Sequence, residues 1–140
     1  MAEGIFKHQV LQRKLGDKYY SDSAGTGAYH IGDQPDPRTL QTLKTHQIAF
    51  NHEARQLNAM DADEFDYILA MDNQNMKDIK KVIDKNHRGL FMMRDFDIKA
   101  KGADVPDPYF GGQDGFESVY EMLNRSISSF LDYIETIDEN

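Results

Sequence analysis

Apolar side chains recur at three- and four-residue intervals through the last part of the chain, and this spacing predicts one long amphipathic helix over about residues 114–135. Its apolar face is formed by Phe116, Val119, Tyr120, Leu123, Ile127, Phe130, Leu131 and Ile134. Similar spacing near the beginning predicts a helix over residues 2–15, with Gly16 as its stop. This first helix begins at Met1 and Ala2 without an N-capping side chain, which is unusual for an amphipathic helix.

Capping side chains predict three further helix starts. Asp36 is followed by a proline, the residue favoured at the first helical position, and the helix that it starts ends near His46. Asn58 caps a short helix through Glu64. Asp72, with the residue after it, caps another helix. The apolar positions of that last helix are Met76, Ile79 and Val82.

Short extended or apolar runs predict β-strands at residues 18–21, 67–71 and 90–93. Strands that alternate with helices favour an α/β fold, with a mainly parallel sheet flanked by helices on both faces. Three short strands are few for five helical segments, so the predicted sheet is underbuilt. No repeat or linker divides the chain, and we expect a single domain over residues 1–140.

The charge balance excludes several classes of function. Asp and Glu number 24 against 16 Lys and Arg, a net charge of −8, whereas nucleic acids and anionic membranes require a basic face. The chain has no cysteine, which excludes disulfides, thiolate metal sites and a cysteine nucleophile within these residues. No apolar run approaches the ~20 residues of a membrane span, and no secretory leader is recognisable, so we expect a cytoplasmic protein.

Three segments could carry chemistry, and each also has a structural interpretation. The small residues from Ser23 to Gly32, with Tyr29 among them, allow close backbone approach to a ligand or form an ordinary loop. His52 beside Arg55 is either catalytic or a hydrogen-bonded structural residue. The histidines show no metal-ligand spacing, so no metal site is expected. Asp107, held between two prolines and followed by aromatics, is a candidate general acid or part of a rigid turn.

These segments together resemble the low-molecular-weight protein tyrosine phosphatases. The pieces occur in family order and cover essentially the whole chain. They are Met1-Ala2-Glu3-Gly4-Ile5-Phe6, Asp22-Ser23-Ala24-Gly25-Thr26, Tyr29-His30-Ile31-Gly32, Pro35-Asp36-Pro37-Arg38, His52-Glu53-Ala54-Arg55-Gln56, Phe65-Asp66-Tyr67-Ile68-Leu69-Ala70-Met71-Asp72 and Asp107-Pro108-Tyr109-Phe110-Gly111.

The resemblance implies a role for six residues. Asp107 matches the family's general acid, which protonates the leaving tyrosyl oxygen and then activates water. The residues that match the aromatic walls around the phosphotyrosine ring are Tyr29, Tyr109 and Phe110. Ser23 and His52 match a pair that supports the phosphate-binding loop and its thiolate. The implied reaction needs no metal or cofactor, and its substrate is a phosphotyrosine protein or a small aryl phosphate.

The family's catalytic loop, of the form C-x5-R, is missing from these residues. The resemblance places it immediately before Met1, together with the first and central strand of the sheet. We therefore expect an N-terminally incomplete domain that is inactive as given. The alternatives are a non-catalytic or regulatory fragment of the same fold and, less favoured because no redox cysteine is present, an arsenate reductase.

Overall fold

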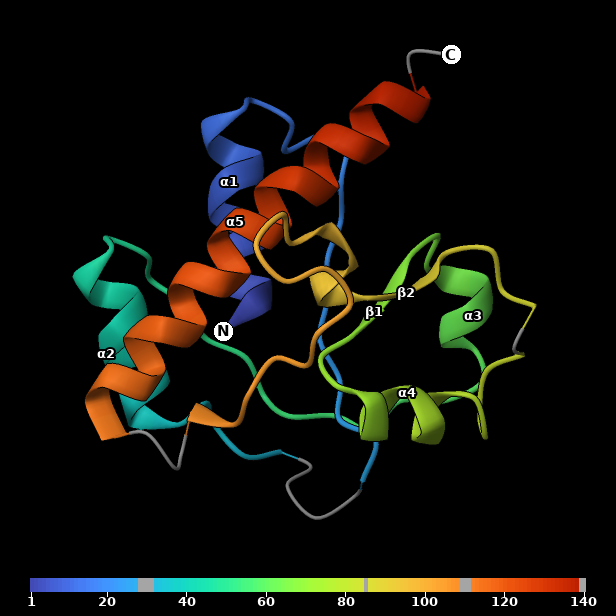
Figure 1. Cartoon of the computed structure of the whole chain (residues 1–140), viewed down its shortest axis with the longest axis horizontal. Coiled ribbons are helices and arrows are strands. Elements are labelled where there is room, and N and C mark those ends of the chain that lie inside the picture. The colour runs from blue at the N-terminus through green and yellow to red at the C-terminus, as the bar shows by residue number, and fades with distance from the viewer. Residues whose placement is uncertain (28–31, 85, 109–111, 139–140) are drawn as a thin grey trace.

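Two short parallel strands lie between helices in the structure, a computed structural model that describes residues 1–27, 32–84, 86–108 and 112–138 (Figure 1). Strand β1 spans Ile68–Ala70 and β2 spans Leu90–Met92, with Ile68 paired to Leu90 and Ala70 to Met92. Both strands fall inside predicted runs. The predicted α/β class with parallel strands is confirmed.

Among the described residues, three helices precede β1, one helix separates β1 from β2, and two helical elements follow β2. They are α1 (Ala2–Gln12), α2 (Pro37–Thr45), α3 (Asp61–Glu64), α4 (Asn73–Ile79), the 3-10 helix η1 (Met93–Phe96) and α5 (Gly112–Asp138). Asp36 caps α2 by accepting from the Arg38 amide at 2.8 Å, and Asp72 caps α4 by accepting from the Asn75 amide at 2.6 Å, so both predicted starts are confirmed. None of the described helices is long and apolar enough to cross a membrane.

Alternate side chains of β1 enter two separate apolar clusters. Leu69 packs into the larger cluster, which α1, α2 and α5 supply with residues such as Ile5, Leu43 and Phe130. Ala70, on the opposite face, packs into a smaller cluster together with Ile79 of α4. Because successive strand residues point to opposite faces, this division places helices on both sides of the sheet, as predicted.

Side-chain hydrogen bonds join α1 and its C-cap to α5. The Gln9 amide donates to the Asn124 carbonyl at 2.9 Å and to the Asn124 side chain at 2.8 Å. One turn on, Arg13 donates to the Ser128 hydroxyl at 3.0 Å and to Asp132 at 2.9 Å. These contacts join residues 115 to 119 positions apart, so the first and last helices lie side by side (Figure 1).

The predicted strand at residues 18–21 is wrong. Residues 19–24 have no regular secondary structure, and the bridge nearest to them joins Gly25 to Gln56. A strand forms only as part of a hydrogen-bonded ladder, and the described residues provide none here. The Tyr20 side chain, 80 % exposed, instead stacks on Phe65 with ring centroids 5.9 Å apart.

The first helix ends earlier than predicted. It ends at Gln12, and Lys14 has a φ of 61°, in the left-handed region usually reserved for glycine. The Leu15 amide bonds the Val10 carbonyl at 2.8 Å, which returns Leu15 to the larger apolar cluster. This hydrophobic contact across the helix end explains why the chain turns before Gly16.

Other boundaries move by a few residues. Val82 lies beyond the end of α4, and Met93 belongs to η1 instead of the strand. Asn58 still accepts from the Met60 amide at 2.9 Å, but the helix proper begins at Asp61. The last helix extends the predicted range at both ends, to Gly112 and Asp138.

Candidate functional site

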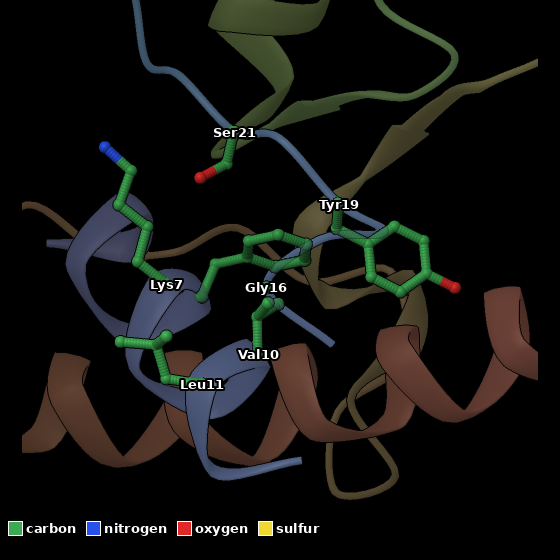
Figure 2. Close-up of a pocket in the computed structure, with 7 residues that line it drawn as sticks. Lys7, Val10, Leu11, Gly16, Tyr19 and Ser21 are labelled. Atoms are coloured by element: carbon green, nitrogen blue, oxygen red, sulfur yellow. The ribbon is translucent and has the colours of Figure 1, made fainter. Parts of the chain in front are cut away.

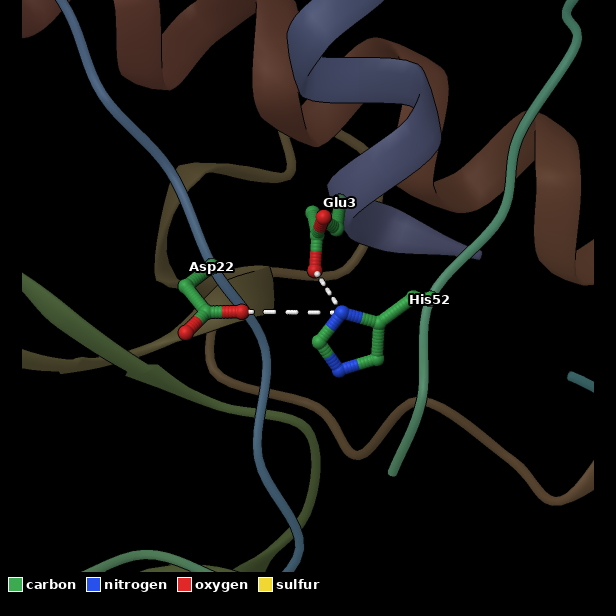
Figure 3. Close-up of side chains that lie close together, drawn as sticks. All are labelled: Glu3, Asp22 and His52. Carbon is green, nitrogen blue, oxygen red and sulfur yellow. Dashed lines mark ion pairs between the residues drawn. The ribbon is translucent and has the colours of Figure 1, made fainter. Parts of the chain in front are cut away.

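Ser23 and His52, which the family resemblance pairs as candidate site residues, both contact Glu3 in the first turn of α1. Figure 3 shows the His52 ring beside Glu3 and Asp22. The Ser23 hydroxyl donates to Glu3 Oε1 at 2.6 Å, and His52 Nδ1 lies 3.3 Å from the same oxygen. Lys7 Nζ pairs with Glu3 Oε2 at 2.6 Å. The Glu3 side chain is 2 % exposed, so these partners, and not water, must stabilise the buried carboxylate.

Backbone pairing brings the two loops of the cluster together. The Gly25 amide donates to the Arg55 carbonyl, and the Leu57 amide donates to the Gly25 carbonyl, both at 2.8 Å. This bridge places Asp22 beside His52, with Oδ1 3.6 Å from Nδ1. The segment containing His52 is thereby fixed against the segment containing Ser23 and Asp22.

Arg55 connects this cluster to a second buried carboxylate. Its Nε donates to Asp22 Oδ2 at 2.8 Å, and its two terminal nitrogens each donate to Asp61 at 3.1 Å. The hydrogen bonds that Arg55 donates to Asp61 are the largest cause of the raised pKa of Arg55. Burial raises the pKa of Asp61, but hydrogen bonds from Arg55 and the Asn58 amide outweigh it and hold this pKa below its usual value. The guanidinium therefore fixes Asp22 from one side.

Three groups of the cluster are close enough to hold a metal ion. One ligand atom each from Glu3, Asp22 and His52 lies within 4.8 Å of the others. The same carboxylates already accept from Ser23 and pair with Lys7 and Arg55, which supply the opposite charge without an ion. The His52 ring stacks near Phe50, and its buried Nε2 has no hydrogen-bond partner in the structure.

Asp107, the candidate general acid, is exposed in the segment that precedes α5. The three candidate aromatic-wall residues, Tyr29, Tyr109 and Phe110, lie outside the described residues. The structure thus brings together Ser23 and His52 at Glu3, and the roles of all six candidates stay predictions.

Sequence reasoning noted Arg55 beside His52 but missed Glu3, Asp22 and Asp61 as parts of the cluster. Glu3 has no distinctive local pattern, because a glutamate in a first helical turn is common on protein surfaces. Its one signal is its position as the second residue of a helix that lacks a capping side chain. Asp22 and Arg55 are 33 residues apart, so only the fold brings them together.

An apolar cavity of about 240 Å³ lies between α1 and residues 16–21 (Figure 2). It is lined by Phe6, Lys7, Val10, Leu11, Gly16, Tyr19 and Ser21. Only Lys7 is shared with the Glu3 cluster, and none of the candidate site residues lines it. We therefore place the candidate site at the polar cluster and not at this cavity.

Comparisons with known proteins find relatives over nearly the whole chain. The family model described as low molecular weight phosphotyrosine protein phosphatase matches residues 1–140. The phosphatase of that name from Schizosaccharomyces pombe is 40 % identical over 133 residues, which cover 94 % of this chain and 85 % of the relative. A putative low molecular weight protein-tyrosine-phosphatase from Synechocystis is 41 % identical over 132 residues, covering 93 % and 84 %.

A solved structure shows the same arrangement of elements. The crystal structure of a protein tyrosine phosphatase from Entamoeba histolytica, with Hepes in its active site, superposes with a TM-score of 0.92 at 33 % identity. The match covers 98 % of this chain and 88 % of that one. From the full-length family match and these similarities, we conclude that the chain belongs to the low molecular weight phosphotyrosine protein phosphatase family.

Proposed function

We propose that this protein hydrolyses phosphotyrosine-type monoesters through a phosphocysteine, with Asp107 as the general acid. The observation that carries the proposal is the family match over the whole chain, which includes the Asp107-Pro108 pair. The exposure of Asp107 next to the first turn of α5 supports it, since a general acid must reach the substrate. The acidic net charge of −8 argues against nucleic acid or an anionic membrane as partner.

The chemistry requires a proton donor. A thiolate attacks phosphorus, an S–P bond forms and the bond to the tyrosyl oxygen breaks. Because tyrosine has a pKa near ~10, its oxygen leaves poorly as an anion, and the Asp107 carboxyl would protonate it. In the second step, the Asp107 carboxylate would take a proton from the water that cleaves the S–P bond.

The other candidates would position these groups. We assign Tyr29, Tyr109 and Phe110 to the walls around the substrate ring. Ser23 and His52 would support the phosphate-binding loop. Their shared contact with Glu3 in the first turn of α1 favours this assignment, because anions bind at helix N-termini.

The thiolate is not supplied by these residues, since the chain has no cysteine. The proposal therefore predicts that the 140 residues alone do not hydrolyse aryl phosphates. A non-catalytic or regulatory fragment is the alternative, favoured by the same lack of a nucleophile. An arsenate reductase is less favoured, because it requires several redox-active cysteines.

The test is to express the protein from its complete reading frame, determine its intact mass and assay aryl phosphates of differing leaving-group pKa. Asp107→Asn should lower turnover of poor leaving groups by roughly 10²–10⁴ and affect good leaving groups much less. Equal losses on both kinds of substrate would mean that Asp107 only shapes a turn. Hydrolysis by a protein with a mass of 16.1 kDa would contradict the phosphocysteine route.

A further inference from the structure

Helices α2 and α5 contact each other at both ends of α2. Near its start, the Arg38 guanidinium lies 4.7 Å from the ring centroid of Phe116, which is 1 % exposed. At its C-cap, the His46 ring stacks on Tyr120 with centroids 3.6 Å apart and planes 10° apart. His46 Nε2 also lies 2.6 Å from Glu117 Oε1. Two contacts at separate points fix both the position and the direction of α2 against α5.

The segment before α2 is anchored at both of its ends. The Gly32 amide donates to the Ala54 carbonyl at 2.6 Å, and the Ala54 amide donates to the Asp33 carbonyl at 2.9 Å. Ala54 lies in the segment that also contains His52. At the other end, Arg38 donates to the Asp36 cap at 3.3 Å. Residues 32–36, which follow Tyr29 in the sequence, are therefore tied to Ala54 at one end and to the start of α2 at the other.

The segment before α5 is anchored in a similar way. The Val105 amide donates to the Met71 carbonyl at 2.7 Å, which ties the segment to the end of β1. The Pro108 carbonyl approaches Gly115 so closely that a Cβ on Gly115 would lie 2.9 Å from it. The segment that carries Asp107 is therefore held between the end of β1 and the first turns of α5.

We propose that Arg38 is a positioning residue, which sets the distance between the segment that follows Tyr29 and the segment that carries Asp107 by stacking on Phe116. The inference rests on the proposed function for its catalytic meaning. Arg38 suits this task because the planar guanidinium can lie flat on a ring while its edge bonds a carboxylate. A lysine has the charge but not the planar face.

The geometric part is tested on the 140-residue chain, which offers a background free of cysteine. Spin labels at Gln34→Cys and Asp107→Cys report the distance between the two segments. Arg38→Gln should shift and broaden the distance distribution. Lys44→Gln, which removes an exposed cation from the same helix, should leave it unchanged. An unchanged distribution in Arg38→Gln would overturn the proposal. If that variant does not fold, Arg38→Lys retains the charge and should still broaden the distribution.

The catalytic part is tested in the protein expressed from its complete reading frame, where Arg38→Gln should lower kcat/KM for poor leaving groups on the order of 10- to 100-fold. Good leaving groups, which need no proton, should lose much less. Equal losses of kcat/KM for poor and good leaving groups would mean that Arg38 only stabilises the fold, and would overturn its positioning role. The proposed function fails separately, if the unmodified protein is inactive or Asp107→Asn shows no leaving-group dependence. The label distances alone then decide whether Arg38 holds the two segments together.

Discussion

Asp97 at the end of η1 gives the sharpest test of how charge stabilises this fold. Its side chain is fully buried and accepts from Arg94 Nε at 2.9 Å, from Arg125 at 2.8 and 3.1 Å, and from the Lys99 amide at 2.9 Å. Arg125 belongs to α5, so this carboxylate joins η1 to the last helix. Replacing it by asparagine keeps the shape and leaves two guanidinium groups without their counter-charge.

The pKa of Asp97 gives the magnitude. Burial raises this pKa, but the hydrogen bonds from Arg125, the Lys99 amide and Arg94 together outweigh burial and lower it from 3.8 to about 2. At roughly 1.4 kcal/mol per pKa unit, this difference corresponds to about 2–3 kcal/mol of folding free energy. Because the folded-state pKa is the lower one, this stability is fully present above about pH 4 and is lost as the pH falls towards about 2.

Urea unfolding of the unmodified protein and Asp97→Asn, followed by circular dichroism, measures the effect. At pH 7 the free energy of unfolding of the variant should be about 2–4 kcal/mol lower, because removing one partner of a buried ion pair leaves the remaining charges uncompensated. Asp132→Asn, which alters an exposed ion pair with Arg13, is the matched control and should cost less than about 1 kcal/mol. A constant difference between Asp97→Asn and the unmodified protein from pH 7 to pH 2 would refute the electrostatic explanation.

Three further variants test other parts of the structure. Glu3→Gln keeps an acceptor for Ser23 but removes the negative charge beside Lys7 and His52. Urea unfolding should show a loss of about 1–3 kcal/mol in the free energy of unfolding, and no loss would mean that water replaces these contacts of Glu3. Gly89→Ala would place a Cβ 1.8 Å from the Asp66 carbonyl oxygen, so thermal unfolding should show a loss of at least about 1–3 kcal/mol. Gly16→Ala meets nothing closer than 3.6 Å and should be tolerated, and equal effects at both glycines would contradict the close approach of Gly89 to the Asp66 backbone.

The parts of the fold that sequence alone predicts are those set by near neighbours in the chain. Asp36 with its proline and Asp72 determine helix starts through amides two or three residues away, and both predictions are confirmed. The apolar run around Ile68 predicts a buried strand, because a short run of consecutive apolar residues must be covered on both faces. By contrast, the predicted strand at residues 18–21 depends on a partner that local sequence does not specify.

The candidate site divides in the same way. Ser23 and His52 were identified through family resemblance, yet the carboxylate that joins them, Glu3, has no distinctive local pattern. Asp97 and Arg125 are 28 residues apart, so their ion pair follows from the packing of η1 on α5. A charged residue is recognised as part of a buried ion pair only after the fold has placed its partner beside it. Helix caps are therefore predictable from sequence, whereas these ionic clusters are not.

The hydrogen bonds between α1 and α5 affect the order of folding during synthesis on the ribosome. Gln9 cannot meet Asn124 until 115 further residues have been added, and at 5–20 residues per second that takes roughly 6–23 s. Throughout this interval the apolar face of α1, including Ile5 and Val10, lacks the helix that covers it in the finished protein. Until Asn124 and the rest of α5 have been synthesised, the nascent chain therefore presents an uncovered amphipathic helix to chaperones, and completion of the larger apolar cluster is a late event.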